Sequence, residues 1–232
     1  MSVTFLDLEQ RSPAWFQARC GRLTGSVAKH VLAERKRGSG ELGDRIKLRA
    51  RLVAERLTGQ SHDEDAFVSN EMRRGIRLES QALLAYEAAY GVIVRPTGFI
   101  RHDTLMVGCS LDGYIGADVQ GIVEVKCPNS DTHLGYWQTG GPDEYDAQAA
   151  HNLWVSGGHW CDFVSYDDRY LDPAMQLLCV RRTRADVDVD TYARKAIAFL
   201  DEVDRDEQVM RTRSNPRAVF QQIVGARLAV AR

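Results

Sequence analysis

The sequence lacks the features that define several large classes of protein. Among its 232 residues no run approaches ~18 consecutive apolar positions, so no membrane-spanning helix is predicted. The N-terminus has no basic region followed by an apolar segment, which argues against a secretory signal. The five cysteines include no C-x-x-C pair, so we expect reduced thiols in a cytoplasmic protein, without a disulfide framework, zinc site or iron–sulfur cluster.

An excess of positive charge is also missing. The 30 Lys and Arg residues are outnumbered by 32 Asp and Glu residues, which gives a net charge of −2. Such a chain does not coat nucleic acid by overall attraction, so a nucleic-acid substrate would require cations concentrated locally. Repeats and low-complexity segments are absent, and an apolar content of 44% is ordinary for a globular protein. We therefore expect one domain over residues 1–232, with a core at about 12–182 and a C-terminal helix and tail at 186–232.

Periodicity and turn residues predict the secondary structure. Helices are expected at 12–21, 23–32, 45–57, 69–90, 132–138, 143–155 and 187–211, followed by a tail at 214–232. Segments 92–100, 106–115 and 122–127 are expected to be successive strands of one sheet, with further strands at 159–166 and 175–181. This order of elements indicates an α/β domain.

The most informative stretch joins an acid at a turn to a short strand. Residues 108–114 read Gly-Cys-Ser-Leu-Asp-Gly-Tyr, and residues 121–128 read Gly-Ile-Val-Glu-Val-Lys-Cys-Pro. Side chains alternate along a strand, so Glu124 and Lys126 share one face while the two valines share the other. Since the valine face is expected to be buried, an acid and a lysine side by side require a partner or a metal ion to offset their desolvation.

The spacing of the two acids favours a metal site. Asp112 precedes Glu124 by twelve residues, which is long enough for the chain to turn and return as a hairpin with both carboxylates side by side. Two carboxylates and the backbone carbonyl of Val125 are hard oxygen ligands of the kind that Mg²⁺ and Mn²⁺ prefer. Lys126 would then hold or deprotonate a metal-bound water, or neutralise charge in a transition state. The alternative is a surface hairpin whose Glu–Lys pair has little energetic value.

These two segments resemble the core of the PD-(D/E)xK nucleases, and more closely the lambda-type alkaline exonucleases of the YqaJ-like viral recombinase family. The usual Pro before the Asp is replaced by Leu111. The resemblance implies an α/β fold with a restriction-endonuclease-like core, in which a mixed central sheet is flanked by helices. It also implies that Asp112, Glu124 and Lys126 belong to the catalytic centre.

An N-terminal motif extends the resemblance. The pattern Trp-x-x-x-Arg-x-Gly-x-x-Thr-x-Ser, which here runs from Trp15 to Ser26, recurs at the start of the lambda-type family, where the Arg and Ser help to hold the DNA 5′-phosphate. A helix start with a hydroxyl binds anions readily, although Ser26 could instead cap its own helix. The segment after Pro128 lacks the basic residue that the family can supply there. The phosphate is therefore expected to bind Arg19, Ser26 and Ser110.

Further positions match the family on predicted helices. The family has a Gly-x-x-x-Glu helix whose Glu faces the metals, which implies that Glu79 is an additional acidic member that acts directly or through water. Gln148 falls where the family carries a Gln beside the catalytic Lys. A solvated Glu and a buried structural Gln are the alternatives. Met72 falls where the family has an apolar residue that wedges the duplex end apart.

Two clusters of cations supply candidate DNA contacts. One cluster lies on a Gly-Ser loop at 34–40, and the other on the first half of the helix at 69–90. Contact with DNA phosphates is the functional interpretation, and a solvated loop is the alternative for the first cluster. The candidate DNA contacts are Arg35, Lys36, Arg37, Met72, Arg73, Arg74 and Arg77.

The residues and the resemblance together predict a metal-dependent exonuclease that digests one strand of linear duplex DNA 5′→3′ and leaves a 3′ overhang. The resemblance implies Mg²⁺ with Mn²⁺ as a substitute, two ions per site, a single-strand annealing protein as partner, and a homotrimeric ring around the DNA. No membrane partner is expected, and a cytoplasmic phage or bacterial recombination system fits. Two alternatives stay open: a structure- or sequence-specific endonuclease on the same core, and a catalytically silent module that binds DNA ends.

Overall fold

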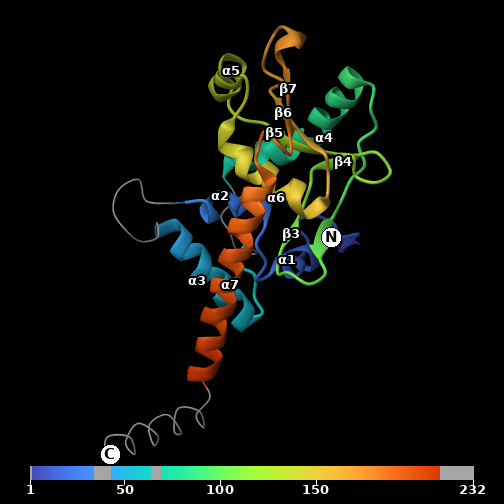
Figure 1. Ribbon diagram of the computed structural model, residues 1–232. Helices are drawn as coiled ribbons and strands as arrows, with labels where there is room; N and C mark the ends of the chain where they lie inside the picture. Colours follow the sequence, from blue (N-terminus) through green and yellow to red (C-terminus); the bar gives the residue numbers. More distant parts are fainter. Residues whose placement is uncertain (1, 34–42, 64–68, 215–232) are drawn as a thin grey trace, which may run out of the picture.

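A computed structural model describes residues 2–33, 43–63 and 69–214 of the chain. A four-stranded sheet lies at one end of the molecule, at the top of Figure 1. The long helix α7 (Val189–Arg213) runs away from it beside α3 (Gly43–Thr58). Within the described ranges, no helix is long and apolar enough to cross a membrane.

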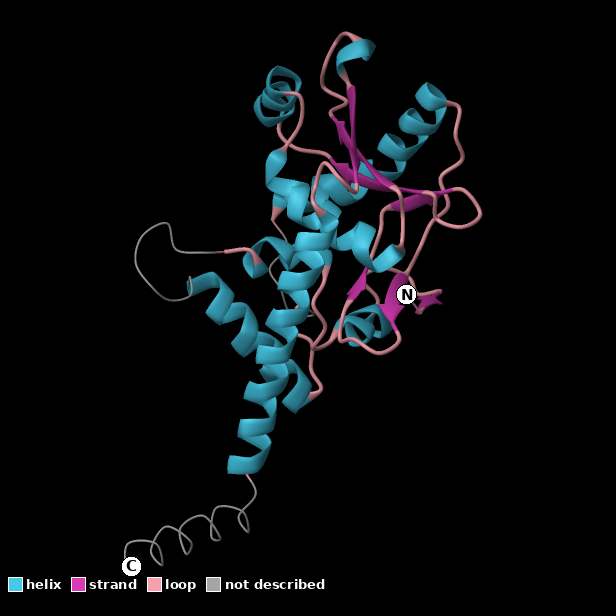
Figure 2. Cartoon of the chain, viewed as in Figure 1, coloured by secondary structure: helices cyan, strands magenta, loops and turns pink. Residues whose placement is uncertain are grey.

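The four-stranded sheet is mixed and carries helices on both faces (Figure 2). Its strands, in spatial order, are β4 (Gly113–Ile115), β5 (Gly121–Lys126), β6 (Trp160–Tyr166) and β7 (Leu177–Thr183). Only β5 and β6 are parallel, and the other pairs are antiparallel. A parallel pair requires a crossover connection, and α5 (Ser130–Thr139), η2 (Asp143–Tyr145) and α6 (Asp146–Ser156) supply it. The predicted mixed sheet flanked by helices is confirmed.

The prediction that segments 92–100, 106–115 and 122–127 form one sheet is wrong. Strands β1 (Val3–Leu6), β2 (Phe99–His102) and β3 (Gly108–Cys109) form a separate antiparallel sheet. After β3 the chain crosses to the four-stranded sheet, where β4 pairs with β5. The lead-in at the N-terminus is the strand that pairs with β2, and its partner lies about a hundred residues away, beyond the reach of a local sequence pattern.

Alternation along β5 separates two apolar clusters. Val123 and Val125 pack with Tyr86 beneath α4 (Asn70–Tyr90). Ile122, on the opposite face, belongs to a larger cluster with Trp154 of α6 and with α7. The predicted assignment of the two faces is confirmed. Glu124 therefore lies on the face of the sheet that α6 covers.

Local signals place the helix ends. The Ser12 hydroxyl accepts a hydrogen bond of 3.2 Å from the backbone N of Trp15, which caps α1 (Pro13–Arg19) as predicted. Gly59, with φ of 70°, follows the end of α3. The segment expected to be a helix at 23–32 divides into a 3₁₀ turn, η1 (Gly25–Val27), and the short α2 (Ala28–Val31).

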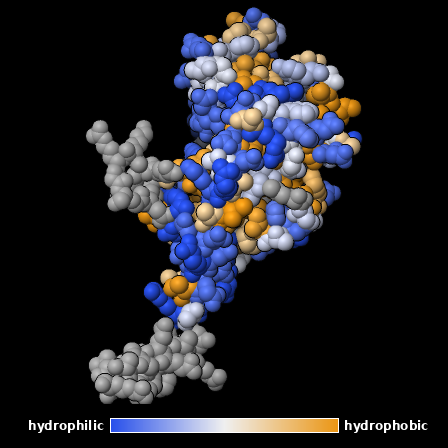
Figure 3. All heavy atoms as spheres, viewed as in Figure 1, coloured by the Kyte–Doolittle hydropathy of each residue, from blue (hydrophilic) through white to orange (hydrophobic). Residues whose placement is uncertain are grey.

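Helix α7 is held against α3 by ion pairs as well as by its apolar face. Arg45 and Arg49 of α3 contact the Glu202 carboxylate at 2.7 and 2.9 Å. Its outward side is mostly hydrophilic in Figure 3, as expected for a helix with one face against a core. Except for Ser214, the predicted tail at 214–232 lies outside the described residues.

Candidate active site

The carboxylate of Asp112 reaches the strand that carries Glu124. Asp112 directly precedes β4, and its Oδ2 accepts a hydrogen bond of 2.6 Å from the backbone N of Val125. Gly113 follows at a point where a side chain has no room, because a Cβ there would lie 2.1 Å from Cγ1 of Val94. The predicted hairpin therefore brings the two acids together, and Asp112 and Glu124 are called the acid pair below.

Glu124 is 5% exposed and receives hydrogen bonds from three side chains. Its Oε1 accepts from Nζ of Lys126 and from Nε2 of Gln148, the latter at 2.5 Å. Its Oε2 accepts from Nδ2 of Asn152 at 3.2 Å. The two amides lie four residues apart on α6 and so share one face of the helix. Strand alternation predicted that Glu124 and Lys126 would point the same way, and the resemblance placed Gln148 beside Lys126. The contact of Gln148 with Glu124 and the presence of Asn152 were not predicted.

Two carboxyl groups face one ammonium group at this site. Burial, followed by the negative charge of Glu124, raises the pKa of Asp112 to about 8, although Lys126 opposes the shift. Burial disfavours the charged form of Lys126, but Glu124 and Asp112 outweigh it, so the pKa of Lys126 lies above its ordinary value. Lys126 is therefore an ammonium at neutral pH, and one cation is shared by two acids.

The acid pair fits a hard divalent cation. Carboxylate and carbonyl oxygens are the ligands that Mg²⁺ prefers. The raised pKa of Asp112 indicates that the site lacks positive charge, and a divalent ion would supply it. Oδ1 of Asn152 is buried and has no hydrogen-bond partner among the described residues. Over residues 2–33, 43–63 and 69–214, no three His, Cys, Asp or Glu side chains form a group that could hold a metal. Other ligands would thus be main-chain carbonyls such as that of Val125, or water.

Glu79 lies on α4 within electrostatic range of Asp112. Its negative charge also raises the pKa of Asp112, but by less than burial and the charge of Glu124 do. Its Oε2 lies 3.7 Å from Nη2 of Arg11. The structure brings Glu79 toward the acid pair, but it does not make Glu79 a third direct neighbour in a metal-binding group.

Arg19 joins the two serines that the N-terminal motif and the central motif supply. Its Nη1 lies 3.5 Å from Oγ of Ser110, and its Nη2 lies 3.4 Å from Oγ of Ser26. The guanidinium lies over the ring of Trp15, 4.2 Å from its centroid. These residues, Arg19, Ser26 and Ser110, are called the Arg19 cluster. The Arg19 side chain is 10% exposed, and its Nε has no hydrogen-bond partner among the described residues.

Helix α3 fixes the turn that follows Arg19. The backbone N of Gly21 donates a hydrogen bond of 2.7 Å to Oε2 of the buried Glu55. Gly21 has φ of 68°, and a Cβ there would lie 2.5 Å from Cγ of Arg56. This position therefore requires glycine, for conformation as well as for space.

Asp63 is an acid that the sequence analysis did not assign to the site. Its Oδ2 lies 3.4 Å from Nη2 of Arg19, and its Oδ1 lies 3.1 Å from Nη2 of Arg51. Burial lowers the pKa of Arg19, and Asp63 opposes that shift. Residues 61–65 read Ser-His-Asp-Glu-Asp, and nothing in this segment signals that one of its carboxylates meets an arginine 44 residues earlier.

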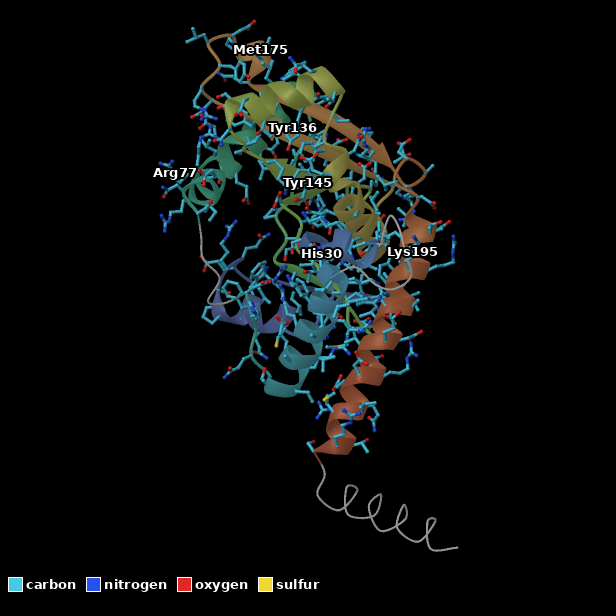
Figure 4. All side chains as sticks on the ribbon, turned by 90° about the vertical axis from the view of Figure 1, so that its left-hand side faces the viewer. His30, Arg77, Tyr136, Tyr145, Met175 and Lys195 are labelled. Carbon is cyan, nitrogen blue, oxygen red and sulfur yellow. The ribbon has the colours of Figure 1, made fainter. Side chains whose placement is uncertain are left out.

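The predicted DNA contacts differ in their surroundings. Arg73 and Arg77 are exposed on α4, and Arg77 lies at the outer side of the molecule in Figure 4. Arg74 contacts Asp167 and Asp168, both at 2.8 Å, and its Nη1 donates to the backbone carbonyls of residues 127 and 128. Arg74 therefore supports the end of β5. Met72 lies in α4, whereas Arg35, Lys36 and Arg37 lie outside the described residues.

Tyr145 is a second neighbour of Lys126 that the motifs did not single out. Nζ of Lys126 lies 5.0 Å from the centroid of its ring. The same ring stacks on Phe163 of β6, with the centroids 5.4 Å apart. Tyr145 lies between Tyr136 and His30 in Figure 4. The face of this ring lies within the range of a cation–π contact with the ammonium group.

Comparison with known proteins relates this arrangement to nucleases. Residues 14–159 match the family described as YqaJ-like viral recombinase domain. An alkaline exonuclease (LHK-Exo) from Laribacter hongkongensis is 34% identical, with a TM-score of 0.75 over 88% of this chain and 98% of its own. Its complex with dAMP matches with a TM-score of 0.77 at the same identity and coverage. A phage related exonuclease from Haemophilus somnus 129PT, 15% identical, shares the fold with a TM-score of 0.59 over 83% of this chain and 96% of its own. None of the curated proteins matches the chain.

Proposed function

Because the chain belongs to the family of YqaJ-like viral recombinase domains, we propose that it is a metal-dependent exonuclease that digests linear duplex DNA. The enzyme removes nucleotides from the 5′ end of one strand and leaves a 3′ single-stranded overhang. The observation that carries the proposal is the convergence of Lys126, Gln148 and Asn152 on Glu124, with Asp112 held on the same hairpin. The PD-(D/E)xK motif requires such an acid, acid and lysine at one point.

The Arg19 cluster binds the 5′-terminal phosphate. A guanidinium beside two hydroxyls offers several donors to phosphate oxygens, and charge-assisted hydrogen bonds of this kind are strong. The buried Nε of Arg19, which has no hydrogen-bond partner among the described residues, supports the assignment, since a phosphate oxygen would satisfy it. The dAMP complex of the 34% identical alkaline exonuclease also supports a site in this fold that accepts a deoxynucleoside monophosphate.

Hydrolysis takes place at the acid pair. Asp112, Glu124 and the carbonyl of Val125 would hold two Mg²⁺ ions, with Mn²⁺ as a substitute and Glu79 as a direct or water-mediated ligand, and the metal supplies Lewis-acid activation of the scissile phosphate and of water. Lys126, held as an ammonium by the two acids, donates to the attacking water or to a phosphate oxygen as negative charge develops. Gln148 orients the same water through the Nε2 group that now contacts Glu124.

A ring-shaped homotrimer that encloses the DNA fits the charge of the chain. A net charge of −2 provides little overall attraction for DNA, so enclosure would keep the enzyme on its substrate while local cations face the channel. The exposed Arg73 and Arg77 support this arrangement. A single-strand annealing protein would then receive the overhang. Light scattering coupled to size exclusion should report a trimer, and a monomer at working concentration would contradict the ring.

Digestion of plasmid DNA tests the proposed function. Linear plasmid with 5′-phosphate ends should release acid-soluble nucleotides with Mg²⁺ and none with EDTA, and 5′-hydroxyl ends should react more slowly. Covalently closed plasmid of the same sequence should resist, since it has no end. Cutting of the closed plasmid would instead assign the endonuclease alternative, and binding to ends without nucleotide release would assign the silent module.

A further inference from the structure

Asn152 lies between the acid pair and the Arg19 cluster. It is 1% exposed on α6, and its Nδ2 donates to Oε2 of Glu124 at 3.2 Å. Its Oδ1 faces away from that bond and lacks a hydrogen-bond partner within the described part of the chain. A buried amide whose oxygen has no partner among the described residues is costly, so its presence at this point indicates a local constraint.

The other side of the Asn152 amide meets the backbone of η1. A Cβ placed on Gly25 would lie 2.3 Å from Oδ1 of Asn152 and 3.3 Å from Cγ of Gln148. Gly25 is buried, and its φ is not in the left-handed region, so it is the close approach of α6 that requires glycine here. Gly25 is flanked by Thr24 and Ser26, whose hydroxyls lie 3.5 and 3.4 Å from Nη2 of Arg19. One side chain therefore touches both the segment that carries Ser26 and the carboxylate of Glu124.

We propose that Asn152 is a positioning residue that sets the distance between the terminal-phosphate site and the hydrolytic site, so that each cut releases a single nucleotide. The inference rests on the proposed function. An exonuclease that holds the terminal phosphate must place the next phosphodiester at its acid pair, and a shift of either group by about one ångström misaligns the reaction. Asn152 fixes both groups at once. It holds Glu124 through Nδ2, and it fills the space beneath Gly25 through Oδ1.

Three variants separate this role from general support of the fold. Asn152→Ala removes the amide, and Gly25→Ala pushes a methyl group into the place that the amide oxygen occupies. The double variant Asn152→Ala/Gly25→Ala adds the methyl group and also removes the amide that would clash with it. Tyr192→Phe is the matched control, because it removes a buried hydrogen bond of 2.8 Å to His151, the neighbour of Asn152 on α6, without touching Glu124.

Two measurements are made on the full chain. The first is Mn²⁺ binding by isothermal titration calorimetry without DNA. The second is the size of the products from 5′-phosphorylated duplex with Mg²⁺, resolved into mononucleotides and dinucleotides. Loss of a group that supports a metal ligand typically costs about tenfold to a hundredfold in affinity or activity, and each single variant should lose that much in both Mn²⁺ affinity and kcat. Each should also release dinucleotides that the wild-type enzyme does not.

The double variant gives the sharpest comparison. If one contact links the two sites, the double variant should be no worse than either single variant, whereas independent sites would multiply the losses. Multiplied losses in the double variant would overturn the inference. So would an Asn152→Ala variant whose Mn²⁺ affinity and product sizes equal those of the Tyr192→Phe control. Wild-type enzyme that releases no nucleotides would instead refute the proposed function, whatever the variants do to Mn²⁺ binding.

Discussion

Oδ2 of Asp63 lies 3.4 Å from Nη2 of Arg19, the guanidinium that we propose binds the 5′-phosphate. Oδ1 of the same carboxylate lies 3.1 Å from Nη2 of Arg51. A carboxylate that contacts two guanidinium groups takes up hydrogen-bond donors and positive charge that could otherwise bind a phosphate. A terminal phosphate would therefore compete with Asp63 for Arg19.

Substitutions of these two residues should act in opposite directions on 5′-phosphorylated duplex. Asp63→Asn should tighten binding about two- to fivefold, because a partly exposed ion pair is worth up to ~1 kcal/mol. Arg19→Ala should weaken it, with a much smaller effect on 5′-hydroxyl duplex. Fluorescence anisotropy of both substrates in EDTA measures these affinities without cleavage. If Asp63→Asn or Arg19→Ala changed both substrates equally, that residue would be removed from the phosphate site.

Substitution at Tyr145 should affect turnover through Lys126. Tyr145→Leu should lower kcat about twofold to thirtyfold, since a cation–π contact is worth ~0.5–2 kcal/mol, whereas Tyr145→Phe keeps the ring and should retain most of the activity. KM for duplex should change little in either variant. Measuring kcat and KM for both variants under the same conditions tests this. Equal loss in the Phe and Leu variants would assign the effect to the hydroxyl group and not to the ring face.

Removal of any member of the central motif should abolish hydrolysis without releasing the DNA. Lys126→Ala, Asp112→Asn and Glu124→Gln should each lower turnover by about a hundredfold or more, because the role proposed for these groups lies mainly in the transition state. Circular dichroism and duplex binding in EDTA should stay close to wild type. A variant that retained more than about a tenth of wild-type turnover would exclude its residue from the reaction.

His151 should make the fold sensitive to acid. Its Nε2 donates to the carbonyl of Gly108 at 3.0 Å, its Nδ1 contacts the Tyr192 hydroxyl, and burial lowers its pKa to about 4. His151 binds a proton more tightly in the unfolded chain than in the folded protein. The contribution of neutral His151 to the free energy of unfolding is therefore complete above pH ~6.5 and is lost as the pH falls toward 4. That loss amounts to about 3 kcal/mol, from ~1.4 kcal/mol per pKa unit.

Urea unfolding between pH 7 and pH 4 measures this linkage. His151→Gln keeps a donor for the Gly108 carbonyl but cannot titrate, so its free energy of unfolding should fall less over this range than that of the wild type. His159→Gln, at an exposed histidine, is the control and should follow the wild-type profile. Parallel profiles for wild type and His151→Gln would contradict the linkage.

Local patterns accounted for the parts of the fold whose causes are local. The cap at Ser12, the Asp–Gly turn at residue 112 and the alternation of valines around Glu124 each depend on neighbours within a few residues, and each appears in the structure. The pairing of β1 with β2 depends on a contact across about a hundred residues, and it was missed.

The site contacts that the motifs left out are also contacts between distant parts of the chain. Strand alternation predicted that Lys126 lies beside Glu124, and the family resemblance placed Gln148 beside Lys126; in the structure both side chains contact Glu124. Asn152, Tyr145 and Asp63 enter only through side-chain contacts between separate elements, for which the sequence carries no periodic or positional signal. Arg74 shows the converse, since its position among other arginines suggested a DNA contact whereas its neighbours are two acids and two carbonyls.

Strand-resolved digestion of a linear duplex tests the central claim most directly. Each strand is labelled in turn at its 3′ end, both 5′ ends carry phosphate, and the wild-type protein is incubated with Mg²⁺ beside a parallel sample of Lys126→Ala. Wild-type protein should shorten the labelled strand stepwise from its 5′ end, release mononucleotides and leave the 3′ label on a long single strand, while Lys126→Ala leaves the duplex intact. Loss of the 3′ label as the first product, or internal cuts at discrete sites, would contradict the assignment as a 5′→3′ exonuclease.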